Sequence, residues 1–375
     1  MMDGKMLKGY YIHFNARDTL GVSNKIDMQL KEMRKYSIVE EIDIRLATKS
    51  LIRNITGVLP FGSLAWDYAE AYQKVEKPDY IYIRKINGDR KLYLFLKHIR
   101  RDFPNCKILI EIHTYPYYQN MLKSVSGIVF LIKDYINYRK IAKLIDRIVT
   151  FSDDQEIFHV PTIQTINGID VQSVCPVEKL REKDSKEISM IAVAMMGKYH
   201  GYERIFNGLK EYYEHGGSHD FQFHIVGEGS VKNEYMKLVK ELGIEKHVVF
   251  WGVKMGEDLH EIYCKADLAI STLAWYKVGI KRSSALKVRE YLAKGLPVVT
   301  GCREDAFDGS DTQYYCQFPN DSSNIDMLKV EKFYHQIYDG VERSQVISDV
   351  RKFAMKHVDI QVAMKPVMDF LIESK

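Results

Sequence analysis

Residues 282–300 read RSSALKVREYLAKGLPVVT, which predicts a helix followed by a short buried strand. Two serines stand where the helix N-cap is expected, and Gly295 stands where the helix should stop. Lys287 and Glu290 are three residues apart, so they lie on one face of this helix. The N-terminus of a helix offers unpaired N–H groups and a positive dipole, and Lys287 adds a full charge beside them. The stretch therefore predicts a phosphate site, although an ordinary capped helix with an exposed Lys–Glu pair fits the residues equally well.

Short apolar runs alternate with helical patterns on both sides of this stretch, which is typical of βαβ units stacked around parallel sheets. Strands are expected at 10–14, 80–84, 107–113, 148–152, 189–197, 248–252, 267–272 and 296–300. Helices are expected at 24–35, 92–104, 232–242, 259–266, 284–294 and 358–371, and a loop at 15–23. The polar, charge-dense residues 175–189 predict a linker, so the chain is expected to hold two α/β domains.

The composition indicates a soluble globular protein. The chain has 375 residues, which suits two domains, with 46% hydrophobic and 28% charged residues. No apolar stretch approaches the ~20 residues needed to cross a bilayer, and the N-terminus lacks the features of a signal peptide. Five scattered cysteines without metal-ligand spacing fit a reducing cytoplasm. Since the sequence also shows no D-x-D motif and no His/Cys/carboxylate cluster, no metal site is expected.

Positive charge is concentrated in the first half of the chain. Residues 1–170 carry a net charge of +6 and the remaining residues −2, while residues 81–147 alone hold 14 basic and 5 acidic side chains. Such an excess can draw a protein to an anionic membrane surface by ~1 kcal/mol per well-placed cation. A solvated basic face explains the pattern equally well. Nucleic acid is not an expected partner, because the basic residues follow no recognised binding motif.

The segment KVREYLAKGLPVV, residues 287–299, resembles the E-Y-x-A-x-G-x-P-V-V segment of retaining glycosyltransferases of family 4. Further stretches are similar to that family in the same order, at residues 20–26 (LGVSNKI), 166–170 (INGID), 225–252 and 258–270. The stretches HGYERIFNGLKEYY and EIHTYPYY look closest to bacterial members that build capsule or exopolysaccharide. The resemblance spans about residues 9–300.

This resemblance implies the GT-B fold, in which two Rossmann-like domains face each other across a cleft. Residues 1–174 would form the acceptor-binding domain, and residues 190–355 the domain that binds a nucleotide-sugar donor. The C-terminal residues 356–375 would pack back on the first domain. Ligands would lie at the C-terminal ends of the parallel strands that face the cleft.

Glu290 matches the second acidic residue of the family's E-x7-E motif, which holds the ribose of the donor nucleotide. The first acidic residue, which contacts the donor sugar, would fall at Arg282, and this is a departure from the family. The resemblance therefore supports the nucleotide end of the donor site and leaves its sugar end open. The donor-binding residues that follow are Glu290, Ser284, Leu286, Gly227, Glu228, Gly21, His200, Lys198 and Arg282.

The family's phosphate-binding Arg and Lys fall within MMGKYHGYER, where His200 stands in place of the usual lysine. Lys287, Arg204 and either Lys198 or His200 could neutralise a diphosphate leaving group. Arg204 and Lys287 are the first predicted catalytic residues, although Arg204 could also be a helix-surface residue. The Gly227–Glu228–Gly229 turn would border the nucleotide base in the family, and by itself a G-x-G commonly means only a tight turn.

In the first half, Gly21 gives the backbone freedom to approach a ligand closely. By resemblance its loop lies near the donor diphosphate and the acceptor, where Asn24 and Lys25 could take part, although both could equally be ordinary residues at the start of a helix. His113 ends a predicted buried strand, a suitable place for a catalytic histidine, although a histidine there is more often structural. Tyr115 and Tyr117 could form an aromatic platform for a sugar ring or a lipid-linked acceptor, and an ordinary packing role fits them equally well.

The sequence thus predicts an enzyme that moves a hexose-type sugar, with retention, from a nucleotide-sugar donor to a saccharide or lipid-linked acceptor. Bacterial surface polysaccharide synthesis at the cytoplasmic face of the membrane is the expected setting. The donor is a co-substrate, so no cofactor is expected, and cations rather than a metal would meet the charge of the leaving group. Arg282 suggests an alternative, a non-catalytic GT-B partner of another glycosyltransferase. A nucleotide-sugar epimerase with this fold is less favoured, because the resemblance points to family 4.

Overall fold

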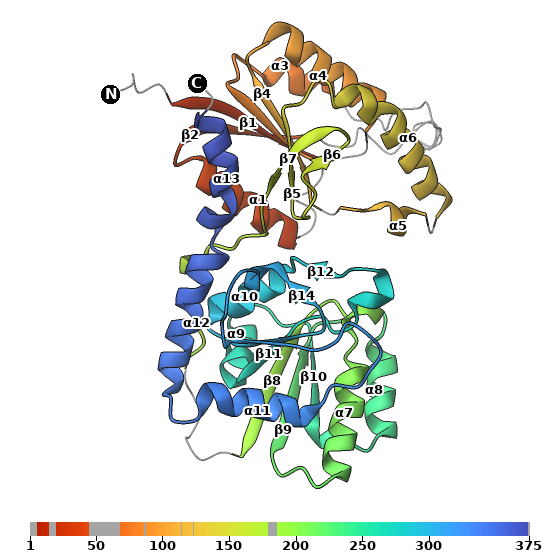
Figure 1. Ribbon diagram of the computed structural model, residues 1–375, viewed down its shortest axis with the longest axis vertical. Coiled ribbons are helices and arrows are strands. Elements are labelled where there is room, and N and C mark those ends of the chain that lie inside the picture. The colour runs from red at the N-terminus through yellow and green to blue at the C-terminus, as the bar shows by residue number, and fades with distance from the viewer. Residues whose placement is uncertain are drawn as a thin grey trace. The chain divides into compact units, whose positions relative to one another are not determined.

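The computed structural model divides the chain into two compact units, each an α/β fold with its own sheet (Figure 1). Unit 1 comprises Met1–Gly168 and Ile360–Lys375, and unit 2 comprises Ile169–Asp359. The structure describes residues 6–14, 20–44, 68–85, 88–113, 115–122, 124–178 and 186–373. Within these ranges, no helix has both the length and the apolar character needed to cross a membrane.

The sheet of unit 1 has seven strands in the order β2-β1-β3-β4-β5-β7-β6, and all neighbours are parallel except β6 and β7. The strands are β1 (Leu7–His13), β2 (Ser37–Asp43), β3 (Tyr80–Arg84), β4 (Lys107–Ile112), β5 (Arg147–Thr150), β6 (Glu156–Ile157) and β7 (Val160–Gln164). Strand β3 is buried at every residue, which is why it reads as the continuous run YIYIR typical of parallel strands. The strand predicted at 80–84 is confirmed.

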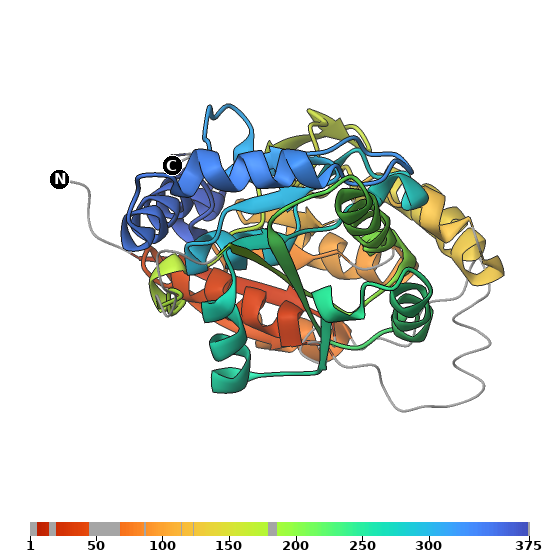
Figure 2. The ribbon, with the colours of Figure 1, turned by 90° about the horizontal axis from the view of Figure 1, so that it is seen from below.

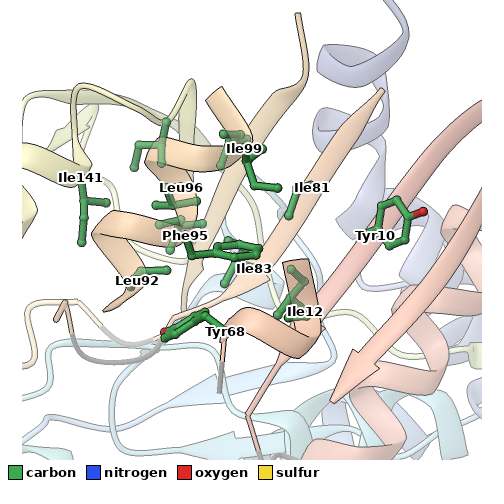
Figure 3. Close-up of a cluster of buried hydrophobic side chains, with 14 of the residues drawn as sticks. Tyr10, Ile12, Tyr68, Ile81, Ile83, Leu92, Phe95, Leu96, Ile99 and Ile141 are labelled. Carbon is green, nitrogen blue, oxygen red and sulfur yellow. The ribbon is translucent and has the colours of Figure 1, made fainter. Parts of the chain in front are cut away.

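Helices cover both faces of this sheet, because successive side chains of a strand point to opposite sides. Tyr10 and Ile12 join a core with α3, α4 and α6, whereas Tyr11 joins a second core with α1 and α13. The helices are α1 (Leu20–Met33), α3 (Tyr68–Lys74), α4 (Arg90–Asp102), α5 (Tyr118–Met121), α6 (Val125–Ile141) and α13 (Ile360–Glu373). Figure 3 shows the first core, with Phe95 of α4 lying against Ile83 of β3.

The sheet of unit 2 has six parallel strands in the order β10-β9-β8-β11-β13-β15. The strands are β8 (Glu187–Val193), β9 (Asp220–Val226), β10 (Val248–Gly252), β11 (Leu268–Ile270), β13 (Val298–Thr300) and β15 (Tyr315–Gln317). Numbered along the chain, this order is 3-2-1-4-5-6, the order of a Rossmann sheet. The predicted fold class, an α/β chain with two Rossmann-like units, is confirmed.

The helices of unit 2 are α7 (Glu203–Glu214), α8 (Lys232–Glu241), α9 (Gly256–Lys265), α10 (Leu286–Lys294), α11 (Met327–Tyr338) and α12 (Arg343–His357). Helix α7 packs against both α8 and α11, and Figure 2 shows these three helices next to one another. Helix α10 packs against α12. A separate pair of short parallel strands, β12 (Arg282–Ser283) and β14 (Arg303–Glu304), lies beside the start of α10.

Three local expectations need correction. The linker predicted at 175–189 overlaps β8, which begins at Glu187 because the apolar run after it is buried in the sheet. Residues 20–23 of the predicted loop form the first turn of α1, while residues 15–19 lie outside the described part of the chain. The helix predicted at 284–294 begins at Leu286.

The C-terminal helix α13 packs on unit 1, whereas residues 356–359 of the segment 356–375 expected there belong to unit 2. Its apolar face supplies Met364, Val367 and Leu371 to the core shared with α1. The ammonium group of Lys107 donates hydrogen bonds to two carbonyls at the end of α13, those of Phe370 (2.8 Å) and Leu371 (2.9 Å). The chain therefore leaves unit 1 after β7 and returns to complete it at the C-terminus.

Candidate functional site

The strand order of unit 2 reverses between β8 and β11, and ligands of such sheets bind outside the carboxyl ends of the strands at this point. The loops that follow β8 and β11 are joined there. The N–H of Leu273 donates to the carbonyl of His200 (2.8 Å), and that of Ala274 donates to the carbonyl of Tyr199 (3.1 Å). Gly201 permits this approach, because its φ is +67° and a Cβ on it would lie 2.5 Å from the Cβ of Ala274. The two loops therefore form one continuous edge.

The predicted G-x-G turn after β9 joins the same edge. Gly227 has a φ of +122°, and a Cβ on it would lie 2.1 Å from the carbonyl oxygen of Ala194. A Cβ on Gly229 would lie 2.1 Å from the carbonyl oxygen of Met196, whose N–H donates to the carbonyl of Glu228 (2.6 Å). Both glycines are needed for this backbone packing. The side chain of Glu228 is exposed at the edge of the turn.

Helix α10 begins beside these loops with Ala285 as its N-cap, so the prediction of a serine cap is wrong. Pairing of β12 with β14 holds Ser283 in the strand, and the helix starts only at Leu286. Ser284 instead accepts a hydrogen bond from Arg289 (3.2 Å). Because the side chain of Ala285 offers no acceptor to the N–H groups of the first turn, this helix end suits an anionic ligand.

Lys287 lies in that first turn. Lys287 as a whole is half-buried, but its ammonium nitrogen is fully buried and has no hydrogen-bond partner in the described part of the chain. The nitrogen lies 5.9 Å from the ring centroid of Tyr202. Burial lowers the pKa of Lys287 to about 7, against the raising effects of Glu304 and Cys302. An unsatisfied buried cation is costly, so an anion at the adjacent helix N-terminus would relieve that cost.

Glu290 lies on the same helix face, one turn further along. Its Oε1 accepts a hydrogen bond from the hydroxyl of Tyr263 (3.0 Å), which leaves Oε2 as an acceptor for a ligand hydroxyl. Burial raises the pKa of Glu290, while Tyr263 and Lys294 lower it. The spacing of Lys287 and Glu290 thus places a cation and a hydrogen-bond acceptor along one helix face, as predicted from the sequence.

A buried ion pair between Arg289 of α10 and neighbouring carboxylates anchors this helix, and it was not predicted from the sequence. Arg289 is 0% exposed and pairs with Asp305 and, at 3.8 Å, with Glu304. Glu304 also accepts a hydrogen bond from Ser271 (3.3 Å), and burial raises its pKa to about 7. The arginine follows Val288 on the inward face of the helix, and its partners belong to a different segment, so the sequence alone gave no signal of the pairing.

Arg204 was predicted as a catalytic cation, with a helix-surface position as the other reading. Arg204 is buried in α7, and its guanidinium group donates hydrogen bonds to backbone carbonyls. Its Nη1 donates to the carbonyl of Leu273 and its Nε to the carbonyl of Ser323, and Asp321 lies 3.7 Å from Nη2. This geometry favours a positioning role, since Arg204 ties together two loops around the site.

His200 and Lys198, the two alternatives for the third member of the predicted cation trio, occupy the short turn after β8. The Nδ1 atom of His200 accepts a hydrogen bond from the N–H of Gly197 (2.9 Å). Burial and the nearby charge of Lys287 lower the pKa of His200 to about 3, so the ring is neutral near pH 7 and supplies no positive charge. His200 therefore cannot serve as the third cation of the predicted trio near pH 7. Lys198 is exposed.

Arg282, the departure from the family motif, lies in β12. Its Nε donates to Oδ2 of Asp308 (2.9 Å), and Arg303 on the paired strand donates to Oδ1 of the same carboxylate (2.6 Å). Arg282 and Arg303 thus share the carboxylate of Asp308. That the sugar end of the site differs from that of the family stays a prediction.

In unit 1, a buried charge network lies at the carboxyl end of β4. Glu111 is fully buried and accepts hydrogen bonds from Lys25 (3.2 Å), Gln29 (2.8 Å) and Tyr82 (2.6 Å), with Arg84 at 3.4 Å. Burial raises the pKa of Glu111, but Lys25, Arg84 and these hydrogen bonds together hold it below its usual range. The network anchors α1 to the sheet, and it was not predicted because its members come from separate segments of the chain.

The predicted loop residues of unit 1 are helical. Gly21 lies in the first turn of α1, where it is exposed and a Cβ would meet no atom within 4 Å. No described protein atom approaches Gly21 closely, and its predicted approach to a ligand stays a prediction. Asn24 is exposed on the same helix. His113 directly follows Ile112, the last residue of the buried strand β4, and the predicted catalytic role of His113 stays a prediction.

The two predicted acceptor tyrosines lie near each other, with ring centroids 6.1 Å apart in a T-shaped arrangement. The hydroxyl of Tyr117 donates to Asp134 (2.6 Å), which also accepts from Lys85 (2.7 Å). Lys85 lies 3.5 Å from the ring centroid of Tyr117. Tyr117 is therefore fixed within a polar cluster, whereas Tyr115 packs against the core through Phe158.

Unit 2 also holds a group of side chains that was not predicted from the sequence. His219, Glu331 and His335 of unit 2 form a cluster of potential metal ligands, although no His/carboxylate cluster was expected. Sequence reasoning missed it because His219 lies far along the chain from the other two residues. The cluster lies at the amino end of β9, whereas the site described above lies at the carboxyl ends of the strands.

Comparisons with known proteins support a glycosyltransferase. Residues 188–322 match a family model described as glycosyl transferases group 1. A glycosyltransferase from Rickettsia africae has a similar structure, with a TM-score of 0.62, 13% identity and coverage of 98% of both chains. The structure of Anabaena HepE with UDP and glucose is also similar, with a TM-score of 0.61 and 14% identity, and the match covers 98% of this chain and 100% of that chain. The lipopolysaccharide outer core galactosyltransferase WaaB has a TM-score of 0.61 and 12% identity, and the match covers 98% of this chain and 100% of that chain. No curated protein matches by sequence.

At these identities the structural likeness establishes the fold alone. The structures are those of GT-B glycosyltransferases, so the α/β architecture of both units is the GT-B architecture. The family-model match covers most of unit 2, including both loops of the site, Lys287 and Glu290.

Proposed function

We propose that the protein is a retaining glycosyltransferase that moves a hexose-type sugar from a nucleotide-diphosphate sugar to a saccharide or lipid-linked saccharide. The buried ammonium group of Lys287 at the start of α10 carries the proposal, because it has no hydrogen-bond partner among the described residues. A diphosphate placed at this helix end would supply one. We place the reaction in bacterial surface polysaccharide synthesis, on the cytoplasmic side of the membrane.

The proposed chemistry needs charge stabilisation and positioning rather than an enzymic nucleophile. Negative charge develops on the leaving diphosphate, and Lys287 with the N-terminus of α10 would stabilise it. Glu290 would hold the ribose through Oε2. The leaving phosphate can accept the proton of the incoming hydroxyl on the same face of the sugar, which gives retention. We assign no metal to this step, because Lys287 and the helix end supply the charge.

A uridine diphosphate sugar is the first donor to test. The Anabaena structure that shares this fold was determined with UDP and glucose, and in a further crystal with UDP-glucose. We therefore propose UDP and UDP-glucose as probes of the site in unit 2. Other nucleoside diphosphates serve as the comparison set for base preference.

Helix α6 in unit 1 supports an acceptor at a membrane. Val125, Ile128, Ile132 and Tyr135 are exposed at helical spacing and form an apolar stripe on this helix. The stripe ends at Arg139, whose Nη2 donates to the hydroxyl of Tyr135 (2.8 Å). An exposed apolar stripe with a basic end is typical of a helix that lies in the headgroup region. We propose that this face contacts an anionic membrane that carries the acceptor.

Nucleotide binding tests the donor site. Isothermal titration with UDP is expected to show that Lys287→Met weakens binding by at least tenfold, because a charge-assisted contact is lost. Glu290→Gln should weaken it less, since the amide oxygen can still accept a hydrogen bond. Lys237→Met is the matched control, because Lys237 is an exposed lysine on α8 paired only with Glu241. Equal UDP affinity of the Lys287 and Lys237 variants would overturn the assignment of the site.

Vesicle co-sedimentation tests the membrane contact separately. The wild type is expected to bind anionic vesicles more strongly than neutral ones, and Ile132→Glu on the stripe should reduce that binding. Equal binding of the wild type to both kinds of vesicle would remove the electrostatic part of the proposal.

Arg282 favours a second candidate, a non-catalytic partner of another glycosyltransferase. Arg282 stands where the resemblance places a carboxylate, and it pairs with Asp308, as Arg303 does. Donor hydrolysis and transfer assays distinguish the two functions. A wild type that binds UDP but turns over no nucleotide-sugar, and that binds another glycosyltransferase, would establish the partner role.

A further inference from the structure

The cluster of His219, Glu331 and His335 lies in unit 2 at the opposite end of β9 from the nucleotide site. Glu331 and His335 are one turn apart on α11, and His219 immediately precedes β9. The potential ligand atoms of the three residues all lie within 4.8 Å of one another. Each side chain is half-buried, so the cluster is neither a core packing group nor a fully solvated surface patch.

The polar atoms of this cluster are incompletely satisfied. The Nδ1 atom of His219 is buried and lies 3.2 Å from Oε1 of Glu331, yet it makes no hydrogen bond in the part of the chain that the structure describes. A buried ring nitrogen without a partner is costly. A cation between this nitrogen and the carboxylate would satisfy both atoms.

Neighbouring groups hold the ligands in a suitable orientation. The Oε2 atom of Glu331 accepts a hydrogen bond from Tyr212 (2.6 Å), which leaves Oε1 for a metal. The Nδ1 atom of His335 lies 2.9 Å from Oδ1 of Asp339, which leaves Nε2 for a metal. Histidine ligands of metals usually donate their second ring N–H to a carboxylate in this way. Glu331 and Tyr212 also line a pocket of about 370 Å³, so solvent reaches this side of the cluster.

We infer that His219, Glu331 and His335 form a zinc site. Two imidazoles and one carboxylate are ligands that Zn²⁺ takes in proteins, with water as a fourth ligand. Ligand atoms on one tetrahedral zinc stand ~3.4 Å apart at bond lengths of about 2.1 Å, so the cluster closes on the ion with side-chain adjustments of ~1 Å. The ion would link α11 to the segment before β9 and so stabilise unit 2.

The zinc site takes no part in the proposed transfer chemistry. His219 stands at the amino end of β9 and Gly227 just past its carboxyl end, a separation of roughly 25 Å at ~3.3 Å per residue. A test of the zinc site is therefore independent of any test of the donor site. It also leaves the proposed donor chemistry without a metal.

Zinc titration of the full chain, purified without a histidine tag and stripped with a chelator, tests the inference. The wild type is expected to bind one Zn²⁺ in competition with a chromophoric chelator and to show a higher Tm with Zn²⁺ than with chelator. His335→Ala and Glu331→Gln should lose both effects. Asp339→Asn, which changes a positioning residue, should weaken zinc binding by roughly 10–100-fold.

His159→Ala is the matched control, because His159 is an exposed histidine of unit 1 that pairs with Glu156 but belongs to no group of three metal-ligating side chains among the described residues. It should bind zinc as the wild type does. Circular dichroism of each variant separates loss of the site from loss of the fold, and the wild-type measurement needs no variant at all. A wild type that fails to retain zinc against the chelator, or a folded His335→Ala that retains it equally, would overturn the inference.

Discussion

At the scale of single residues, the function proposed for this protein depends on the protonation of Lys287. Burial lowers its pKa to about 7, far below the ordinary value of 10.5, so the free protein holds a side chain that is only partly charged near pH 7. A bound diphosphate would favour the charged form and raise the pKa again. Ligand binding and proton binding are therefore coupled at this residue.

UDP binding is expected to take up a proton between pH 7 and about 9. In this range the free Lys287 is largely neutral, whereas the bound form holds its proton, so affinity should fall as the pH rises. We expect roughly tenfold weaker binding at pH 8.5 than at pH 7. Isothermal titration in two buffers of different ionisation enthalpy measures the uptake directly. Lys287→Met should show no such pH dependence, and a wild type without proton uptake would contradict the coupling.

At the scale of elements, helix α10 shows which parts of a site are readable from local pattern. Its apolar spacing and the stop at Gly295 were predicted, and Gly295 indeed ends the helix with a φ of +89°. The helix was predicted to start at residue 284 but starts at Leu286. The pairing of β12 with β14, which delays the start, is a contact between separate segments and cannot be read from local pattern. Arg289 shows the same limit. Its inward position follows from helical spacing, but its ion-pair partners belong to another segment and cannot be predicted from local spacing.

Removing Arg289 should destabilise unit 2. Arg289→Met leaves the carboxylates of Asp305 and Glu304 buried beside an apolar side chain, which typically costs about 3–5 kcal/mol. Arg303→Met is the control, because Arg303 is largely exposed and its pair with Asp308 should contribute no more than ~1 kcal/mol. Urea denaturation of both variants measures the difference. Equal stability of the two variants would show that the buried pair does not anchor α10.

At the scale of the whole molecule, unit 1 is built from both ends of the chain. Five apolar residues of α13 are buried in its second core, namely Ile360, Met364, Val367, Met368 and Leu371. Burial of such side chains contributes about 1.5–3 kcal/mol each, so their sum rivals the whole stability of a domain.

Deletion of residues 360–375 should therefore unfold unit 1 and spare unit 2. Calorimetry of the full chain and of the truncated chain is expected to show loss of the transition of unit 1. UDP binding should persist, because its proposed contacts lie in unit 2. A truncated chain with an unchanged unfolding profile would mean that α13 contributes little to unit 1.

The alternation of strands and helices, the α/β class, and the spacing that sets Lys287 and Glu290 on one helix face all follow from the amino-acid sequence. These are local properties, since apolar periodicity and glycine stops act within a few residues. Tertiary structure alone decided that the Lys287 ammonium is buried, that Arg204 holds two loops, and that His219 meets Glu331 and His335. Each of these depends on contacts between segments distant in the chain, where burial and neighbouring charge set what a side chain can do.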